Sequence, residues 1–538
     1  MKHHRYIIVL LMVINLSALC KFSFCQKLKD DRLKTAADMK ASMINKLLRQ
    51  WYPQSIDNIY GGFLSTFSYD FKPVGDQDKM IVTQARHTWT NSKAAEMFPN
   101  ITYFKNDARH GFNFLKNVMW DKQYGGFYTY TDRKGNVKEG GFAPKEAYGN
   151  SFAIYALAAY YQLSGDTAVS NLAKKEFRWM EEHSHDPIYK GYYQHMERDG
   201  TPIKRNANEP STSALGYKDQ NTSIHLLESF TELYNVWPDT LLRKRLEEML
   251  FLIRDKIVTK KGYLTLFFKP DWTPISNKDS TQESILRHRN LDHVSFGHDV
   301  ETAYLMLEAS HALGFENDTT TMQVSKKMVD HALANGWDNK AGGFYDEGYY
   351  FAGKPSITII ADTKNWWAQA EGLNTLLMMS DYYPKDQQRY YEKFKILWKY
   401  VQTYLIDQKH GDWYQAGLDT DPKQKTALKG HIWKATYHNF RALMNCIQRL
   451  NPDKQPPSVP QNLKLHVEKN LAVLRWDTAK NNKAFVGYNI YRDSIKIGYT
   501  PLNYFTLEDF KQKKVDSFSV RAIDVQGNES VFTKAIDY

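Results

Sequence analysis

Tyr60-Gly61-Gly62-Phe63 opens a pattern that recurs through most of this 538-residue chain. The motif is repeated unchanged at Tyr124-Gly125-Gly126-Phe127. Four looser copies follow at Lys190-Gly191-Tyr192-Tyr193, Lys261-Gly262-Tyr263-Leu264, Gly342-Gly343-Phe344-Tyr345 and His410-Gly411-Asp412-Trp413. The glycines lie roughly 65 to 80 residues apart, a period that indicates a repeated structural unit. Glycine followed by aromatic residues favours a tight turn into a short strand, so each copy predicts a small hairpin.

Two helical patterns accompany each copy of the motif. The first is apolar all round, which predicts a helix buried on most sides. These runs are Gln84 to Met97, Tyr148 to Leu163, Thr222 to Val236, His298 to Leu313, Trp366 to Met379 and Tyr437 to Leu450. The second is amphipathic, as in Tyr103 to Met119, and Leu33 to Trp51 supplies this partner before the first glycine. The sequence therefore predicts a mainly α fold, an (α/α)6 barrel or helical toroid with short β-hairpins at one end.

The first turns of the six apolar helices carry polar and aromatic exceptions. If the hairpins share one end, these turns converge on one mouth. A lone buried histidine or tryptophan is usually a core residue, but matching positions in six repeats favour a site. The exceptions are Arg86 with Trp89, Tyr148 with Asn150, Asn221 with His225, His298 with Glu301, Trp366 and Trp367 with Gln369 and Glu371, and Trp433 with His438, Asn439 and Arg441.

Histidines, an arginine, carboxylates and tryptophans at one mouth indicate proton transfer on a carbohydrate. Inversion of a carbon beside a sugar carbonyl needs a base on one face and an acid on the other. Histidine suits both roles because its pKa lies near neutrality. A cation such as Arg86 would stabilise the enediolate, and tryptophans would hold the sugar faces.

Five ordered motifs resemble the N-acylglucosamine 2-epimerase family, with order and spacing closest to its cellobiose 2-epimerase branch. They are Gln84 to Thr90, Lys218 to His225, Gly297 to Glu301, Trp366 to Glu371 and Trp433 to Asn439. The resemblance covers about Leu33 to Leu450 and implies an isomerase that needs neither cofactor nor metal. The implied reaction interconverts reducing-end glucose and mannose at C2 of a β-1,4-linked disaccharide through an enediolate.

The resemblance also implies roles for individual residues. His298 and His438 would be the two acid/base groups, with neither assigned to a face of C2. His225 would assist ring opening or hold the intermediate, Arg86 would bind the O1/O2 side, and Glu301 would orient His298 or bind the sugar. The predicted substrate-binding set is Tyr148, Asn221, Trp366, Trp367, Glu371, Trp433 and Trp89.

Three features depart from the branch pattern and leave the choice between cellobiose and mannobiose open. Ala435-Thr436 stands where a cysteine and a proline are usual, and Ser223 stands where a histidine is common. Export is also unusual for this family.

Two long segments before inner helices, Pro202 to Leu215 and Lys269 to His293, are interpreted as loops that cover the substrate, with Trp272 as a stacking residue.

The two ends of the chain differ from the repeats. Residues 1–26 have basic residues before a short apolar run, which predicts a signal peptide and an exported protein, periplasmic or extracellular; a lipid on Cys20 or Cys25 is the less favoured alternative. The barrel is predicted over residues 27–450 and a linker over 451–460. Residues 461–538 alternate in short runs and resemble a fibronectin type III β-sandwich that packs on the barrel or tethers it to a surface.

Composition narrows the partners. The formal net charge of +11 is spread along the chain, which disfavours nucleic-acid binding. Apart from the signal, no run is apolar enough to span a membrane. We expect a monomer that binds a small oligosaccharide. Two alternatives stay open: an inverting glycoside hydrolase using Glu301 and Glu371, and a non-catalytic sugar-binding protein. A metal site built from His225, His298 and Glu301 is a weaker variant.

Overall fold

The computed structural model describes residues 26–138, 142–479, 486–508, 510–511 and 516–538. The predicted signal peptide, residues 1–26, lies outside this part of the chain apart from Gln26, and so do Cys20 and Cys25. Within the described residues, no helix is both long and apolar enough to cross a membrane.

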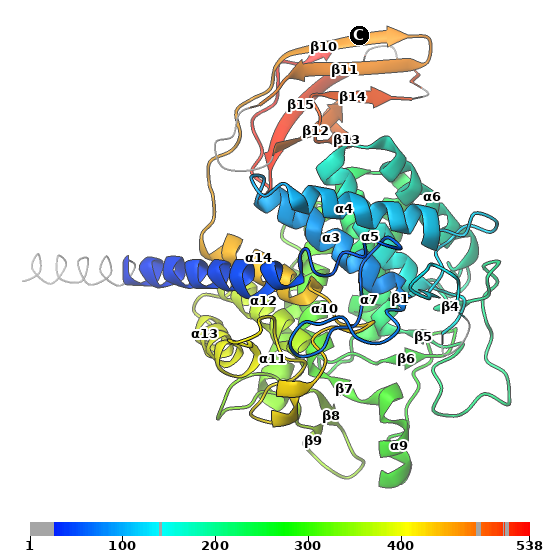
Figure 1. Cartoon of the computed structure of the whole chain (residues 1–538), viewed down its shortest axis with the longest axis vertical. Coiled ribbons are helices and arrows are strands. Elements are labelled where there is room, and N and C mark those ends of the chain that lie inside the picture. The colour runs from blue at the N-terminus through cyan, green and yellow to red at the C-terminus, as the bar shows by residue number, and fades with distance from the viewer. Residues whose placement is uncertain (1–25, 139–141, 480–485, 509, 512–515) are drawn as a thin grey trace, which may run out of the picture.

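Inner helices form a closed ring in which each packs against the next and the last returns to the first (Figure 1). In the described part of the chain the ring comprises α3 (Ile81–Met97), α5 (Ala147–Ser164), α7 (Gln220–Val236), α10 (Phe296–Ala312), α12 (Trp366–Tyr382) and α14 (Tyr437–Leu450). These helices coincide with the six apolar runs of the sequence. The predicted (α/α)6 barrel is confirmed.

An outer layer of helices surrounds this ring. The first outer helix covers residues 26–42 and continues through η1 (Met43–Leu48) and α2 (Arg49–Trp51). The others are α4 (Tyr103–Phe114) with η2 (Leu115–Met119), α6 (Thr167–His183), α8 (Thr240–Leu252) with η3 (Ile253–Ile257), α11 (Thr319–Asn335), and α13 (Tyr390–Tyr400) with η4 (Val401–Leu405). Asp166, Asp239 and Asp318 cap α6, α8 and α11 by accepting hydrogen bonds from backbone N–H groups of the first turn.

Short antiparallel strands tie consecutive repeats together where the inner helices begin. The pairs are β1 (Lys79–Met80) with β2 (Tyr130–Thr131), β3 (Lys145–Glu146) with β4 (His195–Met196), β5 (Lys218–Asp219) with β6 (Phe267–Phe268), and β7 (Val294–Ser295) with β8 (Glu347–Tyr349), which also pairs with β9 (Thr358–Ala361). β1, β3, β5 and β7, which directly precede inner helices, thus pair with the following repeat. Isolated bridges continue the pattern from Asn365 to Ala416 before α12 and from Gly430 to Phe67 before α14. This arrangement places the six helix N-termini at the same end.

The glycine motifs form the predicted turns. Gly62 has a φ of 65°, which favours glycine. A Cβ at this position would lie 2.7 Å from the Phe114 ring and 2.5 Å from Gln84 Oε1. Gln84 Oε1 accepts a hydrogen bond from Phe63 N at 2.8 Å, so the inner helix holds the turn directly.

A buried lysine–aspartate pair, here called a hairpin ion pair, joins the turn to the inner helix in five repeats. Each lysine side chain is at most 1% exposed. The pairs within the described residues are Lys79–Asp57, Lys145–Asp121, Lys218–Asp186, Lys364–Asp338 and Lys429–Asp407, with N···O distances from 2.7 to 3.2 Å. In the fourth repeat Thr259 and Val294 occupy the two positions, so both charges are absent together.

The C-terminal region is all-β and has its own core. One sheet has the strand order β10 (Gln461–Glu468), β11 (Leu471–Asp477), β14 (Tyr504–Leu507). The other has β13 (Ile495–Thr500), β12 (Val486–Arg492), β15 (Ser517–Asp524), β16 (Ile536–Asp537). Trp476 and Tyr488 lie in the core of this region.

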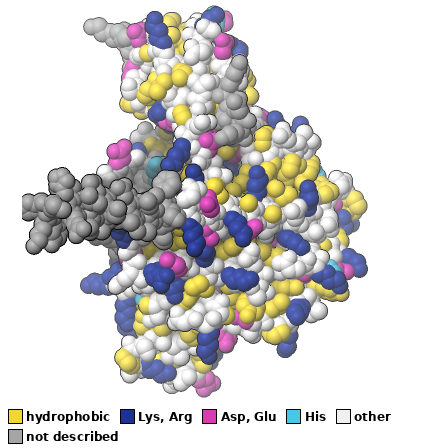
Figure 2. All heavy atoms as spheres, turned by 90° about the vertical axis from the view of Figure 1, so that its left-hand side faces the viewer, with side chains coloured by type: hydrophobic (Ala, Val, Ile, Leu, Met, Phe, Trp, Pro, Cys, Tyr) yellow, Lys and Arg dark blue, Asp and Glu magenta, His cyan; other side chains and the backbone are white. Residues whose placement is uncertain are grey.

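Specific contacts connect the β region to the barrel at the end opposite α9 (Gln282–Asp292) (Figure 1). Tyr161 of α5 donates a hydrogen bond from its hydroxyl to Tyr499 O at 2.9 Å, and the Tyr499 hydroxyl donates to Gln162 O at 3.2 Å. Tyr499 is 4% exposed and belongs to the hydrophobic core of the barrel. On the face shown in Figure 2, lysine and arginine side chains are scattered among acidic and apolar ones rather than gathered into a stripe.

Candidate active site

A pocket of about 190 Å³ lies where the inner helices begin, and ten predicted residues line it. They are Arg86, Tyr148, Asn221, His225, His298, Glu301, Trp366, Trp367, Trp433 and His438. We call this the histidine pocket. Each inner helix, or the segment just before it, contributes at least one of these side chains. The structure therefore brings together residues that are more than 340 positions apart in the chain, as Arg86 and Trp433 are.

Two predicted residues lie outside this lining. Glu371 stands directly behind His438, whose Nδ1 is 2.7 Å from Glu371 Oε1. Trp89, one helical turn after Arg86, stacks on Tyr155 with ring centroids 5.1 Å apart and borders a different cavity. It takes no part in lining the histidine pocket.

The two proposed acid/base histidines flank one tryptophan. The ring centroids of His298 and Trp367 are 4.6 Å apart, and those of Trp367 and His438 are 5.9 Å apart. His298 Nδ1 lies 2.8 Å from Ser295 Oγ. Burial lowers the pKa of His298 to about 3 and that of His438 well below its usual 6.5. Both rings are therefore neutral near neutral pH.

A buried ion network centred on Arg441 supports the pocket from below. The guanidinium NH2 lies 2.6 Å from Glu301 Oε1 and 2.7 Å from Glu371 Oε1, and NH1 pairs with Glu228. Glu228 also accepts a hydrogen bond from the Tyr437 hydroxyl and contacts His225 Nδ1 at 2.9 Å. Desolvation opposes ionisation of Glu228, but Arg441 and His225 outweigh it and hold its pKa at about 2.

Sequence reasoning missed Glu228 as a site residue and left Arg441 without a role. A signal was present: His225, His298 and His438 are each followed three positions later by a charged residue on an otherwise apolar helix. These residues are Glu228, Glu301 and Arg441. Positions three apart share a helix face, so the charged residue lies beneath each histidine.

The network also bears on metal binding. Among the described residues, the one group whose ligand atoms converge within 4.8 Å is Glu301, Glu371 and His438. Arg441 NH2 already contacts both carboxylates of this group. A fixed guanidinium thus provides the positive charge that such a cluster requires.

Arg86 and Trp433 form the outer part of the pocket. Arg86 NH1 donates to Trp433 O and NH2 to the Tyr148 hydroxyl, both at 3.1 Å. The guanidinium lies over the rings of Phe152 and Tyr437, at 4.5 and 4.9 Å from their centroids. Trp433 is 38% exposed, so an apolar ring face remains available at the mouth.

The predicted covering loops contact each other. Ser211 Oγ lies 2.8 Å from His288 Nε2, which joins the segment before α7 to the helix α9 in the segment before α10. Trp272, expected to stack on a sugar, is instead 3% exposed, and its Nε1 donates to Tyr189 O at 2.9 Å. Its ring fills the space above Gly191, which makes it a packing residue.

A closed helical toroid with two neutral histidines, an arginine and tryptophans at its mouth defines the class of sugar isomerases built on an (α/α)6 barrel. The N-acylglucosamine 2-epimerase (GlcNAc 2-epimerase) family matches residues 61–442, and the chain belongs to this family. The family is one of isomerases and epimerases, as the resemblance implied.

Named relatives agree with this assignment. A cellobiose 2-epimerase of Bacteroides fragilis is 26% identical over 420 residues, which cover 77% of this chain and 98% of the relative. A D-mannose isomerase of Thermobifida fusca is 23% identical and covers 67% of this chain and 84% of the relative. The solved cellobiose 2-epimerase of Spirochaeta thermophila matches with a TM-score of 0.66 at 26% identity, covering 79% of this chain and 98% of that chain.

Proposed function

We propose that the protein is a sugar 2-epimerase that interconverts glucose and mannose at the reducing end of a β-1,4-linked disaccharide without a cofactor. The observation that carries this proposal is the pair of buried, neutral histidines, His298 and His438, on either side of Trp367 in one pocket. The names of the relatives, cellobiose 2-epimerases and a mannose isomerase, support the same reaction class.

We infer the tautomer of each ring from the contact behind it. Burial raises the pKa of Glu371, and Arg441, whose NH2 lies 2.7 Å from Oε1, opposes that rise and favours the carboxylate. A carboxylate can only accept hydrogen bonds. Nδ1 of His438 therefore carries the proton, and its Nε2 is free to accept one. The Ser295 hydroxyl can donate to His298 Nδ1, which leaves the proton on His298 Nε2. In this state His438 is the base and His298 the acid.

The reaction then follows from these positions. His438 Nε2 takes the proton from C2 of the open-chain sugar, and the electron pair moves onto the carbonyl oxygen. Arg86 stabilises the resulting enediolate. His298 returns a proton to C2 on the opposite face, which inverts the carbon. The proton gained by His438 is then released to solvent and the one lost by His298 is replaced from solvent, which restores both neutral rings, and the reverse reaction exchanges the two roles. We assign ring opening to His225, which contacts Glu228 at 2.9 Å, and stacking on the second sugar to Trp433, which is 38% exposed.

The inverting-hydrolase alternative fits the carboxylates poorly. Inverting enzymes place two carboxyl groups on opposite sides of the scissile bond, about 6.5–9.5 Å apart. Here oxygens of Glu301 and Glu371 lie within 4.8 Å of each other and contact the same guanidinium nitrogen. Arg441 NH2 holds both carboxylates side by side, so they do not lie on opposite sides of the pocket as the two groups of an inverting enzyme do.

Incubation with cellobiose in D2O with a chelator tests the proposal. We expect the epimer, glucosylmannose, with deuterium at C2. Release of glucose would instead support hydrolysis, and binding without turnover would support the sugar-binding alternative. Replacement of His298 or His438 by asparagine should abolish exchange, and full epimerisation by both variants would refute the two-histidine mechanism.

We further propose that the protein is exported by its N-terminal segment and that residues 461–538 form a fibronectin type III-like module docked on the barrel. The Tyr161–Tyr499 contact supports docking rather than a free tether. Cell fractionation of the full chain tests export: protein found with its N-terminal residues intact in the cytoplasm would contradict it.

A further inference from the structure

A second cavity, of about 180 Å³, lies deeper in the barrel, beyond Arg441 as seen from the histidine pocket. It is lined by the second halves of five inner helices and by Val525, which follows β15 in the β region. The two cavities have no lining residue in common. We call this the carboxylate cavity because Glu96, Glu232 and Glu308 line it.

The charges of this cavity do not balance. Lys93 Nζ lies 2.6 Å from both Gln162 Oε1 and Glu232 Oε1, and 3.7 Å from Glu96 Oε2. Arg441 also borders the cavity, but its guanidinium is engaged by Glu228, Glu301 and Glu371. One lysine thus faces three carboxylates.

An acceptor in the cavity is left without a donor. Glu96 is 4% exposed, and its Oε1 has no hydrogen-bond partner in the described part of the chain. A buried acceptor without a donor is costly, so the cavity is suited to a ligand that donates hydrogen bonds. Burial raises the pKa of Glu96 and of Glu308 to about 7, which shows that their ionised forms lack sufficient positive charge nearby.

The spacing of the carboxylates favours an organic cation over a metal ion. Among described residues, the only three ligand groups that converge within 4.8 Å are those of Glu301, Glu371 and His438, outside this cavity. Glu96, Glu232 and Glu308 are spread more widely, whereas a metal ion needs its oxygen ligands about 2–2.6 Å away. The walls include the rings of Trp89, Tyr155 and Tyr304, which also attract ammonium groups.

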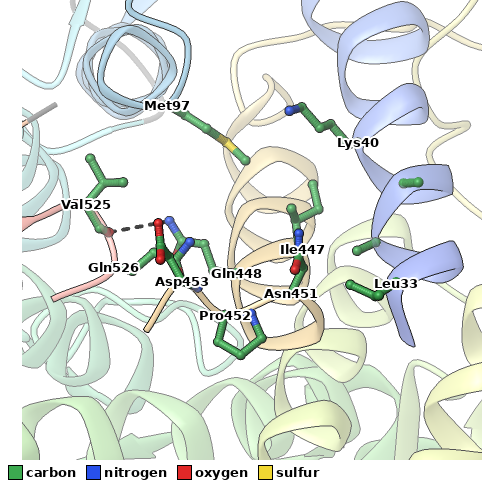
Figure 3. A pocket seen from close by; sticks show the side chains of 12 residues that line it. Leu33, Lys40, Met97, Ile447, Gln448, Asn451, Pro452, Asp453, Val525 and Gln526 are labelled. Atoms are coloured by element: carbon green, nitrogen blue, oxygen red, sulfur yellow. Dashed lines mark hydrogen bonds between the residues drawn. The ribbon is translucent and has the colours of Figure 1, made fainter. Parts of the chain in front are cut away.

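A groove gives access to this cavity from the surface. It has a volume of about 420 Å³ and lies between the first outer helix, the end of α14 and the β region (Figure 3). Met97, Gln448 and Val525 line both the groove and the carboxylate cavity, so the two are adjacent. Because Val525 belongs to the β region, this region forms part of the passage.

We propose that the carboxylate cavity is a binding site for a small aliphatic ammonium ion, separate from the histidine pocket. A linear diammonium ion would supply the two positive charges that Glu96 and Glu308 lack when they ionise. Its ammonium groups would donate to Glu96 and Glu308, and its methylene chain would lie against the aromatic wall and Met97.

Calorimetry and thermal unfolding of the full chain test the site. The probes are butane-1,4-diammonium, the neutral butane-1,4-diol of similar shape, and potassium ions. We expect the diammonium to bind and to raise the unfolding temperature, with no comparable effect of the diol or potassium. Glu96→Gln combined with Glu308→Gln should weaken binding at least about tenfold. Glu392→Gln, on the exposed face of α13, is the matched control and should bind as the parent does.

Three results would overturn the proposal. Equal binding of the diol would show that charge is not recognised, and unchanged binding by the Glu96/Glu308 variant would place the ligand elsewhere. Loss of binding in His298→Asn would place the ammonium ion in the histidine pocket. If the double variant fails to fold, Val525→Trp provides a second test, because it narrows the passage from the surface and should slow association.

Discussion

At the scale of single residues, Arg441 connects the candidate catalytic groups. It contacts three glutamates, and each of these lies next to or behind a pocket histidine. An isolated charge in this environment would be strongly destabilising, but the mutual contacts satisfy it. The network therefore fixes the orientation of the histidine rings as well as the charge of the glutamates.

Replacing Arg441 by lysine should separate these two contributions. Lysine keeps the charge but cannot contact three carboxylates in the guanidinium geometry, so we expect kcat to fall by about 10- to 100-fold with a smaller change in KM. Steady-state kinetics with cellobiose checks this. Arg389→Lys, at an exposed arginine, is the control. Unchanged kcat in the Arg441 variant would contradict a positioning role.

The lowered histidine pKa values predict the pH profile. Because burial keeps His298 and His438 neutral in the folded protein, we expect kcat/KM to stay within about twofold from about pH 8 to pH 5.5. Their unfolded-state pKa is about 6.5, so the folded state should lose stability as the pH falls below this value. Initial rates measured alongside circular dichroism distinguish a change in activity from loss of the folded state. An acid decline with pKa near 6.5 in folded protein would refute the prediction.

Glu96→Gln should stabilise the ligand-free protein in a pH-dependent way. The folded-state pKa of about 7 lies above the usual 4.5, so the stability that this carboxyl contributes at low pH is lost as the pH rises through 7. Removing the ionisation should recover up to about 3 kcal/mol at pH near 8.5 and much less at pH near 5. Urea unfolding at both pH values measures this change in the free energy of unfolding. An identical change at both pH values would count against a raised pKa of Glu96.

At the scale of structural elements, the hairpin ion pairs hold each turn against its inner helix. The fourth repeat has Thr259 and Val294 in place of both charged residues. Loss of one partner alone would leave a buried charge, whereas joint replacement leaves none. The fourth repeat is thus a natural version of the double replacement.

A double-mutant cycle at Lys218 and Asp186 reproduces that change in the third repeat. Each side chain is 1% exposed, so Lys218→Val or Asp186→Thr alone should destabilise by about 3–5 kcal/mol. The double variant should be less destabilised than the sum by about 2 kcal/mol or more. Chemical denaturation gives the four values. Strict additivity would show that the pair contributes no coupling.

Helical periodicity was sufficient to predict the inner ring and ten residues of the histidine pocket. The contacts beneath the pocket were not predictable in the same way, because Arg441 meets Glu228 across 213 positions and no local pattern reports that pairing. The prediction for Trp89 was wrong for a different reason. Its helix and its burial were predicted correctly, but the surroundings of its ring depend on the exact start of α3. An aspartate lies four or five residues before the first hairpin glycine in five of the six repeats, a sequence signal for the hairpin ion pairs.

At the scale of the whole molecule, Tyr499 of the β region contacts α5 of the barrel. We expect Tyr499→Ala to destabilise the protein by about 3–5 kcal/mol, because the side chain is buried in the core of the barrel. The histidine pocket lies at the other end, so kcat should not change. Thermal unfolding and kinetics together check this. Tyr504→Ala, which removes a 37% exposed ring from β14, is the control, and an equal loss in both variants would contradict the docking contact.

The seam that closes the ring also joins two sides of the candidate active site. Arg86 meets Trp433, and Tyr52 meets Thr436, across 347 and 384 positions. A ribosome makes the N-terminal repeats first, so the apolar surfaces of α3 and α12 that contact α14 stay uncovered until α14 has been synthesised. His438 arrives with that last inner helix. A chain that ends before α14 lacks both the closing helix and the proposed base. We therefore expect a partly synthesised barrel to be inactive.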